Sequence, residues 1–122
     1  MRLERERVLR EIYDAANRGD FEDLVAHLDP DVEWRAPTRT IRGRNAVAGW
    51  LAGWHASYHP RHELEAVLHA GDDAVALVHI TYEGREDNRP AHVWRFEGER
   101  VTRARIAVDR DRALAELGLA EG

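Results

Sequence analysis

The first half of the chain carries hydrophobic residues at helical spacing. The first stripe, at positions i, i+3, i+4 and i+7, consists of Leu9, Ile12, Tyr13 and Ala16. This stripe predicts an amphipathic helix that ends at Gly19. Asp20 is a typical N-cap residue, and the apolar positions after it predict a short second helix over residues 21–28. A third helix is predicted over residues 45–58, since Pro60 follows it closely.

Alternation of apolar and polar residues predicts the strands, which cover residues 32–36, 64–68, 74–82, 92–96 and 102–108. Polar residues 38–43 are expected to form a loop, and residues 109–118 a short last helix. The predicted order is therefore helix, helix, strand, helix, and then four antiparallel strands linked by hairpins. This order predicts an α+β fold in which the helices pack on one face of a curved antiparallel sheet. A cavity between the sheet and the long helix would be the usual place for a small ligand.

Length and composition fit one globular domain, residues 1–122. The chain has 122 residues, of which 43% are hydrophobic, so it can form a core of ordinary size. It has no apolar run near the roughly 20 residues that cross a bilayer. Its first six residues are too charged for a secretory signal, and a cytoplasmic location is therefore expected.

Missing residue types exclude several kinds of chemistry. There is no cysteine, which excludes disulfides, thiolate nucleophiles and cysteine-based metal sites. All 18 basic residues are arginine, which excludes a Schiff-base lysine and a phosphate-binding loop of the Walker A type. The net charge is −5, and arginines alternate with carboxylates along the chain, so we expect no nucleic-acid or membrane partner. No cofactor is expected.

His92 and Tyr13 are the candidate catalytic residues. His92 shares one predicted strand face with Trp94 and Phe96, where burial can tune an imidazole for acid–base chemistry. The alternative is a buried histidine bonded to a backbone carbonyl. Tyr13 lies on the apolar stripe of the first helix, where its hydroxyl can reach a ligand or point away from the cavity.

The four tryptophans can supply flat apolar walls for a ring-shaped ligand, although core packing explains such residues equally well. Alternation along the strands places further small or aliphatic side chains on the inward face. Thr102 and Val108 are expected in the same inward row. The predicted ligand-binding residues are Trp34, Trp50, Trp54, Trp94, Ala36, Val78, Ile80, Ala104 and Ile106.

Two further patterns have a structural and a functional interpretation. His55 and His59 have the i, i+4 spacing that can join two metal ligands on a helix, with His62 nearby, but Pro60 ends that helix, so no metal site is predicted. Arg103 and Arg105 alternate with the inward row and should face outward. They fit either a solvated surface or a homodimer interface with arginine–carboxylate pairs.

Several short segments resemble the SnoaL-like family of the nuclear transport factor 2-like superfamily. They are YDAANRGDF (13–21), LDPDVEW (28–34), IRGRNAV (41–47) and AHVWRF (91–96). The resemblance covers nearly the whole chain. It implies a cone-shaped α+β barrel with a deep pocket, commonly a homodimer through the outer sheet face.

The resemblance also bears on catalysis. The catalytic positions of ketosteroid isomerase relatives correspond to Ile12, Ala36 and His92, so that set is absent, as is the carboxylate set of epoxide hydrolase relatives. His92 resembles the strand histidine of polyketide cyclase relatives, without a facing carboxylate. We therefore expect a protein that binds a small hydrophobic molecule, either as a cofactor-independent isomerase, dehydratase or cyclase or without catalysis. A dimeric association domain is the third possibility.

Overall fold

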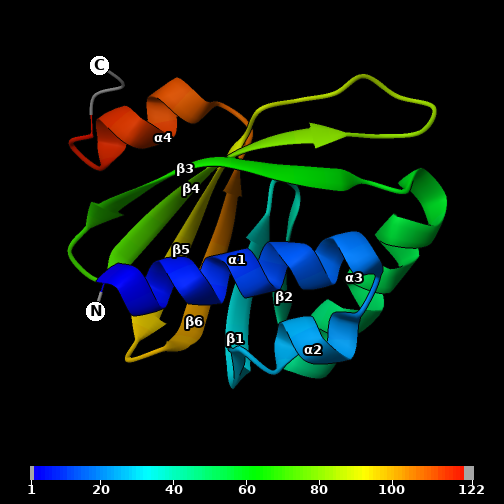
Figure 1. Cartoon of the computed structure of the whole chain (residues 1–122), viewed down its shortest axis with the longest axis horizontal. Coiled ribbons are helices and arrows are strands. Elements are labelled where there is room, and N and C mark those ends of the chain that lie inside the picture. The colour runs from blue at the N-terminus through cyan, green and yellow to red at the C-terminus, as the bar shows by residue number, and fades with distance from the viewer. Residues whose placement is uncertain (1, 120–122) are drawn as a thin grey trace.

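The computed structural model describes residues 2–119, and within them four helices and six strands (Figure 1). The helices are α1 (Arg2–Arg18), α2 (Phe21–Val25), α3 (Arg44–Tyr58) and α4 (Arg110–Glu116). The strands are β1 (Leu28–Ala36), β2 (Arg39–Arg42), β3 (Arg61–Ala70), β4 (Asp73–Thr81), β5 (Ala91–Glu97) and β6 (Arg100–Ala107). None of the described helices is long and apolar enough to span a membrane.

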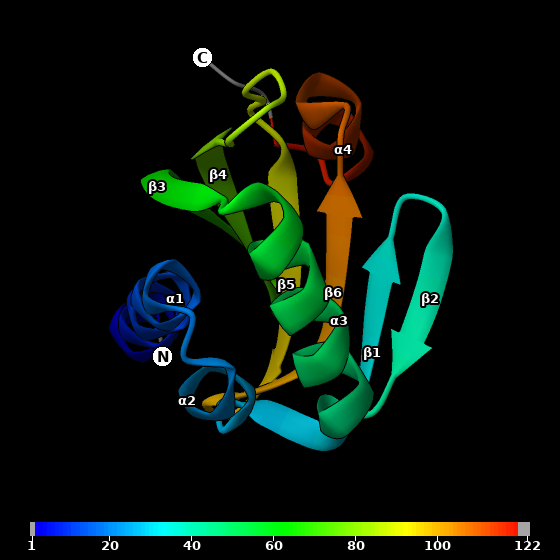
Figure 2. The same ribbon diagram turned by 90° about the vertical axis from the view of Figure 1, so that its right-hand side faces the viewer.

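The six strands form one curved, open sheet in the order β2-β1-β6-β5-β4-β3. Neighbouring strands are antiparallel except β1 and β6, which are parallel. Figure 2 shows α3 lying along the concave side of this sheet, with α1 beside β3. The α+β class and the curved sheet are therefore as predicted.

The stripe on α1 anchors the helix to the core. Leu9 and Ile12 are fully buried, and Tyr13 is only 4% exposed. After α1 ends, the Asp20 carboxylate accepts a hydrogen bond from the Asp23 backbone N–H and caps α2. The last turn of α1 is tied to edge strand β3, because the Asn17 side chain exchanges two hydrogen bonds with the His62 backbone.

The region around β1 differs from the prediction in two ways. The second helix ends at Val25, and Leu28 already belongs to β1. Leu28 and Val32 are both fully buried. A register shift between Leu28 and Glu33 accommodates Pro30 within the strand. The predicted polar loop is instead strand β2, a short edge strand whose one buried residue, Ile41, pairs with Trp34.

The helices do not all lie on one face of the sheet, which corrects the prediction. The buried residues Ala113 and Leu114 of α4 form a second apolar cluster with Val75, Leu77 and Val93. The opposite-facing residues of β4, such as Val78, belong to the main core with α1 and α3. Both faces of β4 are thus covered, which explains why its sequence is an apolar run rather than an alternating pattern.

The predicted inward row on β6 is wrong at Thr102, whereas Val108, just past the end of the strand, lines the cavity although it is 61% exposed. A register shift between Arg95 and Phe96 displaces the pairing of β5 with β6. As a result Val101 is fully buried in the main core. Thr102 is half-buried, and its hydroxyl donates a hydrogen bond to the Arg95 carbonyl. Ala104 and Ile106 belong to the main core as predicted.

Two glycines inside α3 have no packing role. A Cβ at Gly49 or Gly53 would meet nothing within 4 Å. Because glycine is a poor helix former, we expect Gly49→Ala and Gly53→Ala each to raise the free energy of unfolding by about 0.5–1 kcal/mol, measured by urea denaturation. Gly98→Ala is the matched control, since Gly98 also has open space around it but has a φ of +64°. That variant should lose about 1–2 kcal/mol, and stabilisation by it would contradict this account.

Candidate small-molecule binding site

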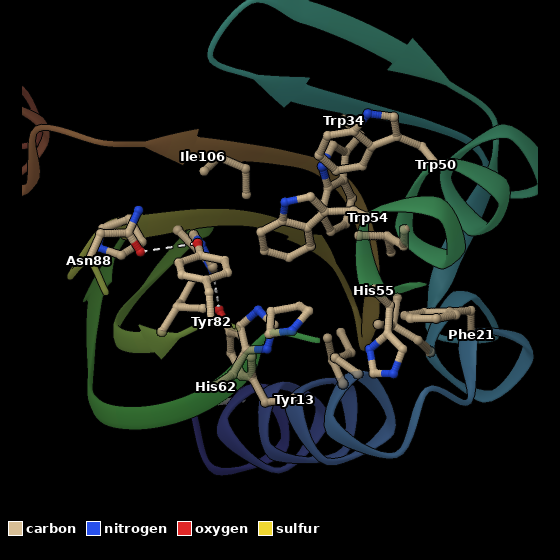
Figure 3. Close-up of a pocket in the computed structure, with 18 of the residues that line it drawn as sticks. Tyr13, Phe21, Trp34, Trp50, Trp54, His55, His62, Tyr82, Asn88 and Ile106 are labelled. Atoms are coloured by element: carbon tan, nitrogen blue, oxygen red, sulfur yellow. Dashed lines mark hydrogen bonds between the residues drawn. The ribbon is translucent and has the colours of Figure 1, made fainter. Parts of the chain in front are cut away.

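A cavity of about 230 Å³ lies between the concave face of the sheet and helices α1, α2 and α3 (Figure 3). Its lining is mainly apolar and aromatic. The aromatic members, histidines aside, are Tyr13, Phe21, Trp34, Trp50, Trp54, Tyr82 and Trp94. This volume is below the roughly 300–1,000 Å³ of sites for drug-sized ligands, so the cavity suits a compact molecule.

Six of the nine predicted ligand-binding residues line the cavity. They are Trp34, Trp50, Trp54, Trp94, Ile80 and Ile106. The remaining three, Ala36, Val78 and Ala104, are not among the lining residues. Ala104 pairs with Trp34 on one side and Trp94 on the other, so the two indoles occupy the space above it. Val78 is fully buried in the core, and Pro37 lines the cavity beside Ala36.

The four indoles form two pairs. Trp50 and Trp54, one turn apart on α3, are stacked with an interplanar angle of 6° and ring centroids 6.2 Å apart. Trp34 and Trp94, on β1 and β5, meet edge to face with ring centroids 5.5 Å apart. Aromatic faces and edges of this kind provide flat apolar contact area for a planar ligand.

The candidate catalytic residues are in direct contact at one end of the cavity. The Tyr13 hydroxyl lies 2.7 Å from Nδ1 of His92 and accepts a hydrogen bond of 3.1 Å from the Trp94 indole N–H. Both Tyr13 and His92 are at most 5% exposed. Helix α1 and strand β5 thus bring together two polar groups that lie 79 positions apart in the sequence.

Burial keeps this end of the cavity uncharged at neutral pH. Desolvation lowers the pKa of His92 to about 3, assisted by the positive charges of His62 and Arg110. Desolvation likewise lowers the pKa of His62 to about 4, with a smaller contribution from His55. Burial raises the pKa of Tyr13 well above its ordinary value, against a weaker opposing effect of the Trp94 hydrogen bond. A neutral phenol and two neutral imidazoles therefore face the ligand space.

His62 is a site residue that the sequence prediction missed. Its ring lies 5.7 Å from the Tyr13 ring and 6.4 Å from the His92 ring, measured between centroids. The predicted strand began at residue 64, two residues too late, although His62 shares a strand face with Leu64. Extending the alternation backward would have placed this imidazole on the inward face.

The loop after β4 also contributes residues that the sequence did not single out. Tyr82 donates a hydrogen bond of 3.2 Å to the side-chain oxygen of Asn88, and both residues line the cavity. The Arg85 guanidinium, exposed beside them, lies over the rings of Tyr58 and Tyr82. This loop therefore brings polar groups, including the Arg85 guanidinium, to the lining of the cavity.

The rings of His55 and His59 near the end of α3 lie 5.9 Å apart, measured between centroids, but each has its own further partner. His59 is in a left-handed conformation at the C-cap, and its Nδ1 pairs with the Glu83 carboxylate at 3.1 Å. The His55 ring also packs against Phe21. Within residues 2–119 no group of three or more histidine or carboxylate side chains could hold a metal ion.

Comparison with known structures supports the fold. An NTF2-like protein of unknown function from Burkholderia pseudomallei K96243 is 24% identical, with a TM-score of 0.75 over 93% of this chain and 97% of that one. A putative polyketide cyclase from Sinorhizobium meliloti is 16% identical, with a TM-score of 0.76 over 81% of this chain and 92% of that one. TerC, co-crystallised with polyporic acid, is 20% identical, with a TM-score of 0.78 over 93% and 97%.

The sequence itself gives the family. A search of curated proteins returned no match. The model of the SnoaL-like domain matches residues 9–104, which include α2, α3, the first five strands and both candidate catalytic residues. The chain therefore belongs to the SnoaL-like family and has a fold of the NTF2-like type.

Proposed function

We propose that this protein binds a compact, neutral, hydrophobic small molecule in the cavity between the sheet and α3. The observation that carries the proposal is the combination of two indole pairs with an uncharged polar end formed by Tyr13 and His92. Flat apolar walls favour a ring-containing ligand, and a few polar groups at one end orient it. Membership of the SnoaL-like family supports the same conclusion.

The electrostatics favour a neutral ligand over an ion. A charged group buried at the Tyr13–His92 end would lose its hydration beside a neutral phenol and two neutral imidazoles, which is costly. The neutral imidazole of His92 could instead hydrogen-bond a carbonyl or hydroxyl group. Hydrophobic ketones, phenols and amides are neutral molecules that carry such a carbonyl or hydroxyl group.

A blocked cavity tests the proposal. Ile106→Trp on β6 places an indole in the ligand space, whereas Arg105→Trp adds the same side chain to the neighbouring, half-buried position that does not line the cavity. We expect wild type and Arg105→Trp to bind naphthalene in calorimetric titrations and Ile106→Trp to bind at least about tenfold more weakly, equivalent to 1.4 kcal/mol. Equal affinity of all three proteins would disprove binding in this cavity.

A cofactor-independent isomerase, dehydratase or cyclase is the second candidate function. The hydrogen bond between Tyr13 and His92 favours it, because an acid–base enzyme needs two polar groups that reach one point. His92 would hydrogen-bond the substrate carbonyl as the acid, and the lone pair of the neighbouring neutral imidazole of His62 would accept a proton as the base. A general acid or base of this kind contributes about 10²–10⁴-fold to the rate.

His92→Ala separates the catalytic from the non-catalytic form of the proposal. For an enzyme, we expect the variant to lose about 10²–10⁴-fold in kcat on a substrate that the wild type converts, because the acid–base group is gone. Circular dichroism of the variant checks that it is folded. Equal rates for variant and wild type would remove His92 from the mechanism.

The association-domain alternative receives less support. It would require a filled cavity and a large apolar outer face, yet the cavity is open and the outer face carries charges. Glu33 on β1 pairs with Arg35, Arg42 and Arg103 within this chain. A homodimer through this face stays a prediction, and light scattering of the purified protein would test it.

A further inference from the structure

The contacts of His62 with Asn17 favour one position for the proton on the His62 ring. The Asn17 side-chain NH₂ donates to the His62 carbonyl at 2.9 Å, so the amide oxygen is the atom that accepts from the His62 backbone N–H at 2.7 Å. The same oxygen lies 3.4 Å from Nδ1 of the His62 ring. Because an amide oxygen can only accept, this long contact favours the tautomer in which Nδ1 is protonated. A neutral His62 ring then has a free lone pair on Nε2.

In the His92 ring the proton lies on Nε2, whereas in the His62 ring it lies on Nδ1. The Trp94 indole N–H can only donate, so the Tyr13 oxygen is its acceptor. Within residues 2–119 the Tyr13 hydroxyl has no hydrogen-bond partner other than Trp94 and His92. If Nδ1 of His92 donated to Tyr13, the buried phenol proton would have no acceptor, which is costly. Tyr13 therefore donates to Nδ1, and the neutral His92 ring carries its proton on Nε2.

The two rings thus offer the cavity unlike nitrogens. Both residues line it, and their ring centroids are 6.4 Å apart. Neither Nε2 atom has a hydrogen-bond partner in the described part of the chain. His92 presents a donor and His62 an acceptor, and both are positioned by hydrogen bonds from α1 and β5 rather than by the ligand.

We infer that the site selects neutral ligands in which a hydrogen-bond acceptor and a donor lie side by side, as in a lactam or a hydroxy ketone. This inference rests on the proposed function and specifies its ligand class. The carbonyl of such a ligand accepts from Nε2 of His92, and its N–H or O–H donates to Nε2 of His62. An analogue without the donor leaves the His62 lone pair unpaired in a desolvated site, which weakens binding.

A matched set of bicyclic probes tests the inference. 2-Quinolone has an N–H next to its carbonyl, coumarin has a ring oxygen in the same place, and naphthalene has neither group. By calorimetry we expect the wild type to bind 2-quinolone about tenfold more tightly than coumarin, as expected for one hydrogen bond. His62→Phe should bind the two equally, while His79→Phe, a histidine that does not line the cavity, should keep the tenfold preference.

The outcomes separate this inference from the proposed function. Equal affinity of wild type for 2-quinolone and coumarin, with naphthalene bound, would overturn the donor–acceptor inference and leave the proposed function standing. Failure of all three probes to bind would overturn both. Long-range ¹H–¹⁵N spectra of the wild-type histidine rings give a second test that needs no variant. We expect protonation at Nδ1 of His62 and at Nε2 of His92, and the opposite tautomer in either ring would overturn the inference.

Discussion

Trp94→Ala is expected to lower the free energy of unfolding by about 3–5 kcal/mol. Trp94 is 1% exposed, and its ring contacts Trp34, Tyr13 and His92. Its removal enlarges the cavity and takes away the indole N–H that donates a hydrogen bond to the Tyr13 hydroxyl. A folded domain has only about 5–15 kcal/mol of net stability, so this is a large fraction of the total. Urea denaturation of variant and wild type gives the difference.

Trp54→Ala is the matched control for this prediction. Trp54 lines the same cavity from α3, but it is only partly buried. We therefore expect a clearly smaller loss of stability from Trp54→Ala than from Trp94→Ala, since the apolar area returned to water is smaller. Equal losses from the two variants, or a loss below about 1 kcal/mol for Trp94→Ala, would show that Trp94 does not hold the cavity wall together.

Mild acid is expected to destabilise the protein because His62 and His92 are buried in the neutral form. Their pKa values in the folded protein are about 4 and about 3, whereas an unfolded histidine has a pKa near 6.5. Between pH 6.5 and about 4 the unfolded chain thus binds more protons than the folded one, and stability falls as the pH is lowered. Each histidine contributes a slope that approaches about 1.4 kcal/mol per pH unit around pH 5 and is smaller near pH 6.5.

Urea denaturation at pH 7, 6 and 5 measures this effect. The carboxylates of Glu33 and Asp87 also have lowered pKa values, owing mainly to hydrogen bonds from Arg35 and His79, but their contribution is lost only below their ordinary pKa values of 4.5 and 3.8. The interval from pH 6.5 to 5 therefore isolates the histidines. His92→Gln should have a shallower pH dependence than wild type, and an unchanged slope in that variant would contradict the assignment.

The parts of the fold that depend on local periodicity were predictable. The stripe that contains Ile12 and Tyr13 gave helix α1 and the face it buries, and the alternation around Trp94 gave β5. The contact between Tyr13 and His92 was not predictable, because it depends on how α1 crosses the sheet. A periodic pattern predicts which face of a helix or strand is buried. It does not predict which residues of two buried faces are in contact.

The errors have physical causes that a single sequence conceals. The register shift beside Phe96 displaces the inward row of β6, and no residue type at that position predicts the shift. Strand β2 has one buried apolar residue, Ile41, too few for a recognisable alternation. The position of α4 on the second face could have been inferred from the apolar run of β4, since a strand with both faces buried needs two covering layers.

The location of a bound ligand tests the central claim most directly. All four tryptophans of the chain line the cavity, so their indole N–H signals in ¹H–¹⁵N spectra report on it without mutation. We predict that titration with naphthalene shifts these four signals and the ring signals of His62 and His92, while the amides of α4 stay unchanged. Saturable binding that leaves the indole signals in place, or no binding at all, would contradict the account.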